Sequence, residues 1–316
     1  MSISSVNQRT LQAPIFGEGV GLHSGQKVSI RLIPAPVNTG LVFVRKDLTP
    51  PVVILARSEY VVETSMATTL GKGQVRVGTV EHLLSALFGL GIDNLRIEVD
   101  GPEVPILDGS AAVFTQWITE AGVRVQDEPK HFLVMKKAVS VTDGDKEATL
   151  APSRGFSIDC TIDFRHPLIS DQSCSLDFAE ETYAREISQA RTFGFLKDVE
   201  RLQQMGLARG GSLQNAIVVD EFSILNPEGL RFPNEFVRHK MLDAMGDLAL
   251  LGHPLIGHLK CFKSGHALHH KLAQKVRADA SSFLLVRAHQ KDVERLNLRW
   301  PDFAHMLDPV TALTHS

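Results

Sequence analysis

The sequence predicts an α/β protein made of two modules that repeat one another, with the paired helices of one module facing those of the other. The chain has 316 residues, of which 43% are hydrophobic, more than one small domain needs for its core. Each half runs through strands, a helix, a glycine, a strand, a tight turn and a second helix. The spacing agrees: 27 positions separate His82 from Gly109, and 26 separate His239 from Gly265. A cleft between two such modules is a natural place for a site.

Strand and helix patterns alternate along the first half. Strands are predicted over Lys27–Ile33, Leu41–Val44, Gln74–Val77 and Asn94–Val99. The first helix is predicted to have Thr79 as its N-cap and to end at Gly89 and Gly91. The second helix is predicted to run from Ala111 to Ala121. Ahead of these elements, the glycine-rich segment 17–25 lacks a dinucleotide-binding pattern, so it indicates a sharp hairpin or a backbone approach to a ligand.

The segment Gln126–Lys130 is polar and holds a proline, and we interpret it as a linker. It divides a first module, residues 1–127, from a second module, residues 128–316. Residues 156–164 alternate between apolar and polar, which predicts a strand with one buried face. Further strands are predicted over Ala216–Val219 and Leu255–Phe262. Helices are predicted over 180–188, 197–205, Asn234–Leu251 and Ser264–Arg277.

The composition restricts the class of function. The net charge is −3 and no long basic run occurs, which argues against bulk nucleic-acid binding. The three cysteines are far apart, as is typical of free thiols in a reducing compartment. The sequence has no apolar stretch of membrane-spanning length and no secretion signal. We therefore expect a cytoplasmic protein, monomeric and without an obligate protein partner.

The most informative stretch is 238–247. His239, Asp243 and Asp247 are spaced at i, i+4 and i+8, so on a helix they form one polar stripe. The surrounding residues are typical of a core, where unpaired charge is costly, so the stripe must be paired or bound to something. A His and an Asp four positions apart can both reach one metal ion. A structural His–Asp hydrogen bond on a solvated face is the more common explanation of this spacing alone.

Two other segments carry histidines. Glu81 and His82 open the first predicted helix, where they suit a general base beside a metal ligand, although a capping glutamate and a surface histidine are the default interpretation. The segment 264–271 holds three histidines. We expect His266 to be functional because a small turn exposes it at a helix N-terminus. His269 and His270 are expected to face solvent.

Several motifs together point to one family. They are Gly19-Val20-Gly21-Leu22-His23-Ser24-Gly25, Glu81-His82, Asp108-Gly109-Ser110-Ala111, Arg191-Thr192-Phe193-Gly194-Phe195, His239-Lys240-Met241-Leu242-Asp243 with Asp247, and Ser264-Gly265-His266-Ala267-Leu268. In this combination the chain resembles the UDP-3-O-acyl-N-acetylglucosamine deacetylases of lipid A biosynthesis. The resemblance runs in order over about residues 8–275 and fades past Arg277, and the tail Gln290–Ser316 is given no role.

The resemblance implies an α+β fold of two similar two-layer α/β sandwich domains with their helix layers packed against each other. It implies hydrolysis of the 2-acetamido group of UDP-3-O-(3-hydroxyacyl)-N-acetylglucosamine, a UDP-sugar lipid precursor, with release of acetate. It also implies the roles of individual residues. The metal ligands would be His82, His239 and Asp243. Glu81 would be the general base and His266 the acid, oriented by Asp247, with Thr192 helping to hold the oxyanion. The substrate would be bound by Lys240, Phe193, His23 and Gly211.

Two histidines and an aspartate suit zinc, Zn²⁺, but they also match the ligand set of iron(II) enzymes, so Fe²⁺ stays an alternative. A binding protein without catalysis would keep the cleft but would not need Glu81 or His266. A metalloprotease would usually carry H-E-x-x-H, which the sequence lacks. A redox iron enzyme is the remaining alternative.

The acyl chain of such a substrate needs an apolar passage, and the segment 206–219 is the predicted one. Gly210, Gly211, Ser212 and Ala216 are small, and Leu207, Leu213, Ile217 and Val218 are apolar. An ordinary buried strand after a glycine turn explains this pattern about equally well.

Overall fold

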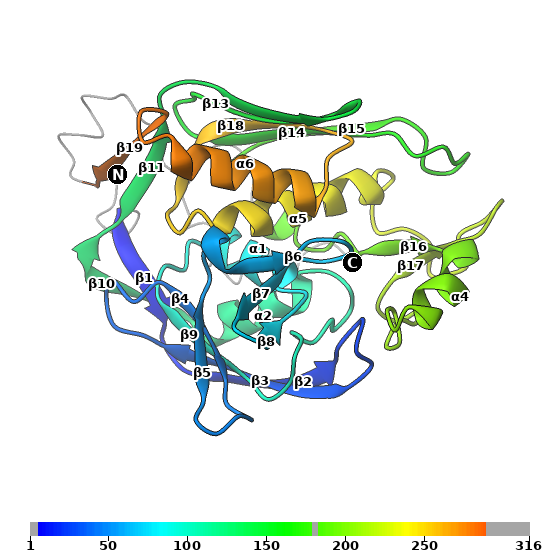
Figure 1. Ribbon diagram of the computed structural model, residues 1–316, viewed down its shortest axis with the longest axis horizontal. Helices are drawn as coiled ribbons and strands as arrows, with labels where there is room; N and C mark the ends of the chain where they lie inside the picture. The colour runs from blue at the N-terminus through cyan, green and yellow to red at the C-terminus, as the bar shows by residue number, and fades with distance from the viewer. Residues whose placement is uncertain (1–5, 179–182, 289–316) are drawn as a thin grey trace.

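Two sheets enclose two layers of helices in the computed structural model, which describes residues 6–178 and 183–288 (Figure 1). The helices of both modules lie in the middle of the molecule, and the sheets lie above and below them in this view. The predicted fold class is therefore confirmed. The tail Gln290–Ser316 and the first residues of the helix predicted over 180–188 lie outside the described residues.

The sheet of the first module has the strand order β2-β3-β9-β4-β5. Its central strand, β9, is antiparallel to β3 and parallel to β4. The helices α1 (Glu81–Gly89) and α2 (Ala112–Ala121) lie on one face of this sheet (Figure 1). The strands are β2 (Ile15–Val20), β3 (Lys27–Pro34), β4 (Leu41–Arg45), β5 (Val52–Leu55) and β9 (Leu95–Val99).

The second module repeats this topology strand for strand. Its order β12-β13-β18-β14-β15 has β18 at the centre, antiparallel to β13 and parallel to β14. The strands are β12 (Val139–Asp143), β13 (Lys146–Ala151), β14 (Phe156–Ile162), β15 (Gln172–Asp177) and β18 (Leu255–Phe262). The helices are α5 (Glu235–Ala249) and α6 (His266–Ala278). The repeat inferred from the order of sequence patterns is thus present in the sheets.

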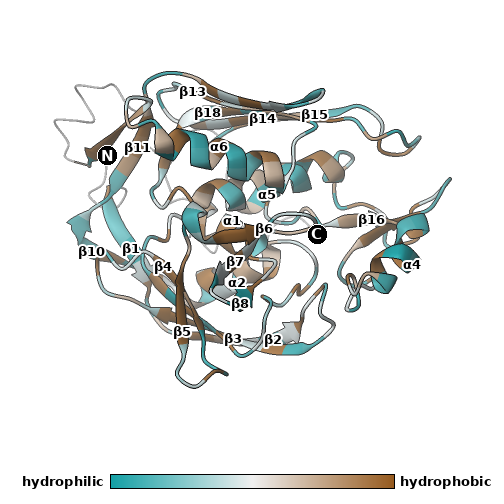
Figure 2. Cartoon of the chain, in the orientation of Figure 1, coloured by the Kyte–Doolittle hydropathy of each residue, from teal (hydrophilic) through white to brown (hydrophobic). Residues whose placement is uncertain are grey.

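Shorter elements complete the two modules. β11 (His131–Met135) and β19 (Phe283–Arg287) extend the second sheet, and β6 (Val61–Glu63), β7 (Thr69–Lys72) and β8 (Val75–Val77) form a small sheet after the 3-10 helix η2 (Ser58–Tyr60). β16 (Phe193–Phe195) pairs in parallel with β17 (Ile217–Val219). Between them lies α4 (Leu196–Gln204), which follows α3 (Tyr183–Glu186) in the chain. Figure 2 shows α4 as largely hydrophilic at the edge of the molecule.

Two predictions about segment ends were wrong. The segment Gln126–Lys130 is not an irregular linker, because Val123–Pro129 forms strand β10, paired with β1 (Asn7–Leu11), and Lys130 is fully buried. Thr79 does not cap α1. Its φ is 54° and its hydroxyl donates to Glu103 Oε1 at 2.7 Å, and Val80 occupies the N-cap position instead.

The closest approach of the two modules is between α1 and α5. A Cβ atom added at Gly246 would lie 2.0 Å from the carbonyl oxygen of Glu81, so only glycine lets the first turn of α1 rest on α5. Nearly every side chain of α1 is buried, and one hydrophobic core runs through both modules. Packing between the modules therefore fixes the start of α1 against the middle of α5. Within the described residues, no helix has the length and apolar character needed to cross a bilayer.

Candidate active site

Three metal-ligating side chains meet where α1 rests on α5. His82 comes from the first turn of α1, and His239 and Asp243 lie one turn apart on α5. The Oδ1 atom of Asp243 lies 3.6 Å from His82 Nε2 and 3.3 Å from His239 Nε2. All three side chains are buried. The structure therefore brings together the three residues that the resemblance assigns to the metal.

The positions of the donor atoms suit coordination of a metal ion better than hydrogen bonds among the three side chains. Asp243 Oδ1 makes no hydrogen bond to any described residue, although it is buried. Tetrahedral ligands with bonds of about 2.0–2.1 Å lie about 3.3–3.4 Å apart, close to both observed separations. His239 Nδ1 lies 3.0 Å from the Ala190 carbonyl oxygen, to which it donates when Nε2 is left free for a metal.

The charges of these groups also favour a metal. Burial, reinforced by His82 and Lys240, lowers the pKa of His239 to about 3, so its imidazole is neutral, as a ligand must be. Burial opposes ionisation of Asp243, but His239 and Lys240 outweigh it and hold the pKa of Asp243 well below its usual range. At neutral pH, His239 is thus a neutral imidazole and Asp243 a carboxylate.

Lys240 and Phe193 flank this group. Lys240 Nζ donates to Asp243 Oδ2 at 2.8 Å and lies 5.6 Å from the centroid of the Phe193 ring. The same ring lies 6.4 Å from that of His239. Lys240 keeps about a fifth of its side chain exposed, at 23%. An anion reaching Lys240 would therefore arrive beside the group of His82, His239 and Asp243.

A second cluster centres on Asp247, one turn further along α5. His266 Nδ1 lies 2.8 Å from Asp247 Oδ2, and the other ring nitrogen, Nε2, lies 3.7 Å from Glu81 Oε1. His266 Nε2 is also 4.0 Å from Asp243 Oδ2. The carboxylate of Glu81 and the free nitrogen of His266 therefore face each other beside the group of His82, His239 and Asp243.

The surroundings raise the pKa of both Glu81 and His266. Burial raises the pKa of Glu81, and the nearby Asp243 adds to the rise. Burial disfavours the charged form of His266, but Asp247 and Glu81 outweigh it and raise its pKa to about 9. Near neutral pH, His266 is therefore protonated and can act as an acid.

The prediction that His269 faces solvent was wrong. Its side chain is buried, and its Nδ1 lies 2.8 Å from the same Asp247 Oδ2 that His266 uses. Its other nitrogen lies 2.9 Å from Ser264 Oγ. Because α6 packs against α5, the side chain of His269 faces the interior as that of His266 does. His270, the neighbouring residue, is half-buried.

Sequence reasoning missed Thr68, which joins the two clusters. Its backbone N–H donates to Glu81 Oε2 at 3.0 Å, and its hydroxyl donates to Asp247 Oδ1 at 2.5 Å. Thr68 is fully enclosed just before β7. A threonine between Ala67 and Thr69 carries no pattern that could have indicated this role.

Asp247, His266 and His269 form another group that could hold a metal ion. The Nδ1 atoms of His266 and His269 already form hydrogen bonds with Asp247 Oδ2, and the Thr68 hydroxyl donates to Asp247 Oδ1. The group is complete without an ion. By contrast, Asp243 Oδ1 is left without a hydrogen bond to the described residues, which favours the set of His82, His239 and Asp243.

Thr192 is held by its backbone. Its N–H donates to the Gly109 carbonyl at 2.7 Å, and its own carbonyl accepts from Ile217 N–H at 2.8 Å. Gly109 is required at this contact, since its φ is +82° and a Cβ would lie 2.1 Å from the Asn215 carbonyl oxygen. The preceding residue, Arg191, forms a buried ion pair with Glu235 at 2.9 Å. Two of the matching motifs therefore serve to fix the loop that carries Thr192.

The glycine-rich segment 17–25 forms the end of β2 and most of the hairpin loop that leads to β3, one of the two alternatives that the sequence left open. In it, His23 Nε2 is buried without a hydrogen bond to any described residue, and burial, with the charges of His266 and His82, lowers the pKa of His23. Gly211 is exposed, and its nearest side-chain neighbour is Leu22 of the same loop. His23 thus lies within electrostatic reach of the site, whereas Gly211 packs on the outside of the hairpin.

The predicted acyl passage over 206–219 is only partly compatible with the structure. Ile217 is fully buried in the core and does not line the cavity beside Val219, its neighbour but one. Gly210 packs against the hairpin so closely that a Cβ would lie 2.3 Å from the Gly21 carbonyl oxygen. Leu213 is exposed. The segment is therefore a turn docked on the hairpin, followed by strand β17.

Comparison with known proteins places the chain in one family. The family model described as UDP-3-O-acyl N-acetylglycosamine deacetylase matches residues 8–278. A UDP-3-O-acyl-N-acetylglucosamine deacetylase of Myxococcus xanthus (strain DK1622) is 62% identical over 308 residues, which is 98% of this chain and 98% of that protein. Another, of Anaeromyxobacter dehalogenans (strain 2CP-C), is 54% identical over 303 residues, 96% of this chain and 98% of that protein. The likeness to the first of these extends past Arg277 into the tail, where it was expected to fade. With a family model that covers most of its length and two relatives above 50% identity, this chain belongs to the UDP-3-O-acyl N-acetylglycosamine deacetylase family.

Proposed function

We propose that the site between α1 and α5 hydrolyses the 2-acetamido group of UDP-3-O-(3-hydroxyacyl)-N-acetylglucosamine and releases acetate, the committed step of lipid A biosynthesis. Membership of the deacetylase family supplies the reaction. The observation that carries the assignment to this site is the convergence of His82, His239 and Asp243 beside a second carboxylate and a protonated histidine.

His82, His239 and Asp243 would hold the metal, and zinc is the ion that we propose. The separations of the donor atoms match tetrahedral coordination, and the free Oδ1 of Asp243 supports an ion at this point. When bound, the ion would polarise the amide carbonyl and make the attacking water more acidic. Iron(II) remains the alternative, because the same ligands suit it. Metal analysis of protein purified without oxygen, with an oxygen-uptake assay, distinguishes a hydrolase holding either ion from a redox enzyme.

Glu81 takes the proton of the attacking water, because its carboxylate is held by Thr68 N–H beside the metal ligands. His266 starts protonated and gives its Nε2 proton to the leaving amine nitrogen as the C–N bond breaks. Asp247 holds the opposite ring nitrogen and so fixes both the direction of Nε2 and the charge of the ring. The products are acetate and the free amine.

Four other residues would bind the substrate. Thr192 would help to hold the oxyanion, and Lys240 would meet a phosphate of the UDP group. Phe193 would pack on the sugar, and His23, whose Nε2 lacks a hydrogen bond to the described residues, would donate to it or accept from it. Each assignment is tested with the corresponding alanine variant, by comparing its change in KM with its change in kcat.

The acyl chain would lie beyond Phe193, along β16. A cavity of about 580 Å³ opens at the far end of this strand, and its apolar lining includes Phe195, Leu196, Val219 and Phe222. Phe222 is 79% exposed, an unusual position for a large apolar side chain. Burying the chain is worth at most about 0.8 kcal/mol for each methylene, so its loss would slow the reaction greatly.

Paired kinetics test the place of the acyl chain. Leu196→Glu puts a charge at the cavity and should lower kcat/KM for the acylated substrate much more than for UDP-N-acetylglucosamine. Met205→Glu is the matched control, since Met205 is also an exposed apolar residue but does not line the cavity. Gly211→Val in the same assay tests the segment 206–216. Equal kcat/KM for the two substrates in the unmutated protein would contradict recognition of the acyl chain.

Mass spectrometry of UDP-3-O-(3-hydroxyacyl)-N-acetylglucosamine after incubation with the metal-loaded protein tests the function itself. The substrate should lose one acetyl group and keep its acyl ester. We further propose a cytoplasmic monomer whose modules divide at residues 127 and 128. Light scattering at assay concentration tests the monomer, and a stable dimer would contradict it.

A further inference from the structure

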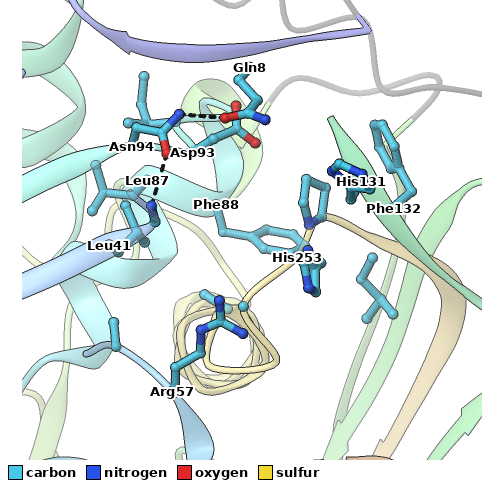
Figure 3. Close-up of a pocket in the computed structure, with 18 of the residues that line it drawn as sticks. Gln8, Leu41, Arg57, Leu87, Phe88, Asp93, Asn94, His131, Phe132 and His253 are labelled. Atoms are coloured by element: carbon cyan, nitrogen blue, oxygen red, sulfur yellow. Dashed lines mark hydrogen bonds between the residues drawn. The ribbon is translucent and has the colours of Figure 1, made fainter. Parts of the chain in front are cut away.

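A second cavity lies at the other end of the helix pair that forms the active site. It has a volume of about 260 Å³, and its walls come from both modules, at the ends of α1 and α5 (Figure 3). Phe88, which lines it, is seven residues beyond Glu81, or about 10 Å along the helix axis. None of the residues assigned above to the metal, to catalysis or to the substrate lines this cavity.

One wall is apolar and aromatic. The rings of Phe88, Phe156 and Phe178 contact one another, with centroids 5.1 Å apart for Phe88 and Phe156 and 5.2 Å apart for Phe156 and Phe178. Leu41 and Leu87 continue this wall. Phe88 is only half-buried, and Figure 3 shows its side chain reaching across the cavity towards His253. Phe156 and Phe178 are buried, so an aliphatic chain lying here would mainly cover the half-buried ring of Phe88.

Arg57 provides a positive charge at one end of the cavity (Figure 3). Its guanidinium packs on the backbone of Gly252, where an added Cβ would lie 2.6 Å from Arg57 Cζ. Its loop is fixed to the second module, because the N–H of Ser58 donates to the Leu250 carbonyl at 2.9 Å. Among residues 6–178 and 183–288, no carboxylate lies within salt-bridge distance of Arg57 and no acceptor takes a hydrogen bond from its side chain.

The neighbours of Arg57 in the cavity are also basic or neutral. His253 and His131 line the same wall, and the charge of Arg57 adds to burial in lowering the pKa of His253 to about 4. The one acidic side chain of the lining, Asp93, already pairs with Lys130 at 2.5 Å. The charge of Arg57 is therefore not balanced by the described residues.

The amide groups at the opposite end are already bonded to one another. Gln8 Nε2 donates to Asn38 Oδ1 at 2.8 Å, and Asn94 Nδ2 donates to Gln8 Oε1 at 2.8 Å. Asn94 Oδ1 accepts from the N–H of Gly40 at 2.9 Å. The amides of Gln8 and Asn94 are therefore occupied, whereas the guanidinium of Arg57 makes no hydrogen bond to the described residues.

We propose that this cavity is a binding site for a monocarboxylate with a short aliphatic chain, whose carboxylate pairs with Arg57 and whose chain lies against Phe88, Phe156 and Phe178. A single guanidinium matches one carboxylate in a planar, two-bonded arrangement, which favours a monocarboxylate over a more highly charged anion. The volume lies just under the usual range of roughly 300–1,000 Å³ for ligand pockets, which restricts the chain to a short one.

Calorimetric titration of the metal-loaded protein with octanoate tests this site. Octanoate should bind, whereas octanol, which lacks the charge, and acetate, which lacks the chain, should bind much more weakly. Arg57→Gln should weaken octanoate binding about tenfold or more, since hydrogen bonds to charged groups are worth about 1.5–3 kcal/mol. Arg57→Lys keeps the charge without the planar pair and should have an intermediate affinity. Arg57→Lys also allows the proposal to be tested if the Arg57→Gln protein does not fold.

Two control variants separate this site from the proposed acyl cavity. Arg209→Gln removes an exposed cation on the hairpin side, and Leu196→Glu disturbs the cavity at the end of β16. Both should leave the affinity for octanoate unchanged. The proposal is overturned if octanoate does not bind, if Arg57→Gln binds it as tightly as the unmutated protein, or if Leu196→Glu rather than Arg57→Gln weakens it.

Discussion

Thr68→Val removes a hydroxyl from the centre of the site and changes little else. The side chains are nearly equal in size, so the substitution creates no cavity. The backbone N–H of residue 68 still reaches Glu81 Oε2. What is lost is the 2.5 Å hydrogen bond to Asp247 Oδ1, between two groups that are both buried. Asp247 then holds His266 and His269 with one of its oxygens unsatisfied.

The size of the effect follows from the kind of bond. A hydrogen bond to a charged group is worth about 1.5–3 kcal/mol. If the transition state loses the full stabilisation of this bond, kcat/KM should fall by roughly ten- to a hundredfold, because each factor of ten corresponds to about 1.36 kcal/mol. The fall should be mainly in kcat, because Thr68 contacts Glu81 and Asp247 and none of the residues assigned to substrate binding.

The assay is acetate release under steady-state conditions, with metal content measured on the same samples. Thr115→Val is the matched control, since Thr115 is also a buried threonine but donates to the Ala111 carbonyl within the first module. This control should keep its activity. A Thr68→Val protein with full metal and kcat/KM within twofold of the unmutated protein would refute the positioning role of Thr68.

Three further predictions follow from the geometry. The profile of kcat/KM against pH should be bell-shaped: activity rises as Glu81 deprotonates, above the range of a free carboxylate because burial raises its pKa, and falls as His266 deprotonates at about pH 9. Glu81→Ala should remove the acidic limb and His266→Ala the basic limb, each with a loss of about 10²–10⁴-fold, and an unchanged profile would contradict the roles. Asp247→Asn should reduce kcat less than His266→Ala does, and a larger loss would show that orientation is not its main role. Gly246→Ala should lower both the melting temperature and activity, because its Cβ would lie 2.0 Å from the Glu81 carbonyl oxygen, and a normal melting temperature would contradict the close packing of α1 on α5.

Periodicity in the sequence predicted most of the elements. The alternation in 156–164 matches β14, where every second side chain is buried, and the helix predicted over Asn234–Leu251 matches α5. The repeat was detectable because both halves place a helix before the central strand of a sheet. Which strands pair could not be predicted, since the paired residues of parallel neighbours such as β14 and β18 are 101 positions apart in the chain.

The errors have a common cause in tertiary contacts. Polar composition made Gln126–Lys130 look exposed, yet the burial of Lys130 is compensated by hydrogen bonds to Gly91 and Asp93. Thr68 and His269 belong to the site through contacts with Asp247 from distant parts of the chain. The residues next to Thr68 and His269 in the sequence do not indicate such contacts. His239 and Asp243, by contrast, are four positions apart on one helix, so their spacing alone predicts that their side chains meet.

Metal content is the most direct test of the site, because His82 comes from one module and His239 and Asp243 from the other. The unmutated protein and Asp243→Ala should be compared by elemental analysis after gel filtration, with Asp159→Ala, at a half-buried position on β14, as the control. We expect one zinc ion per chain in the unmutated protein and in the control. Asp243→Ala should lose most of its metal, its activity and the dependence of its melting temperature on added zinc. Full metal occupancy in Asp243→Ala would contradict the assignment of these three residues as the metal ligands.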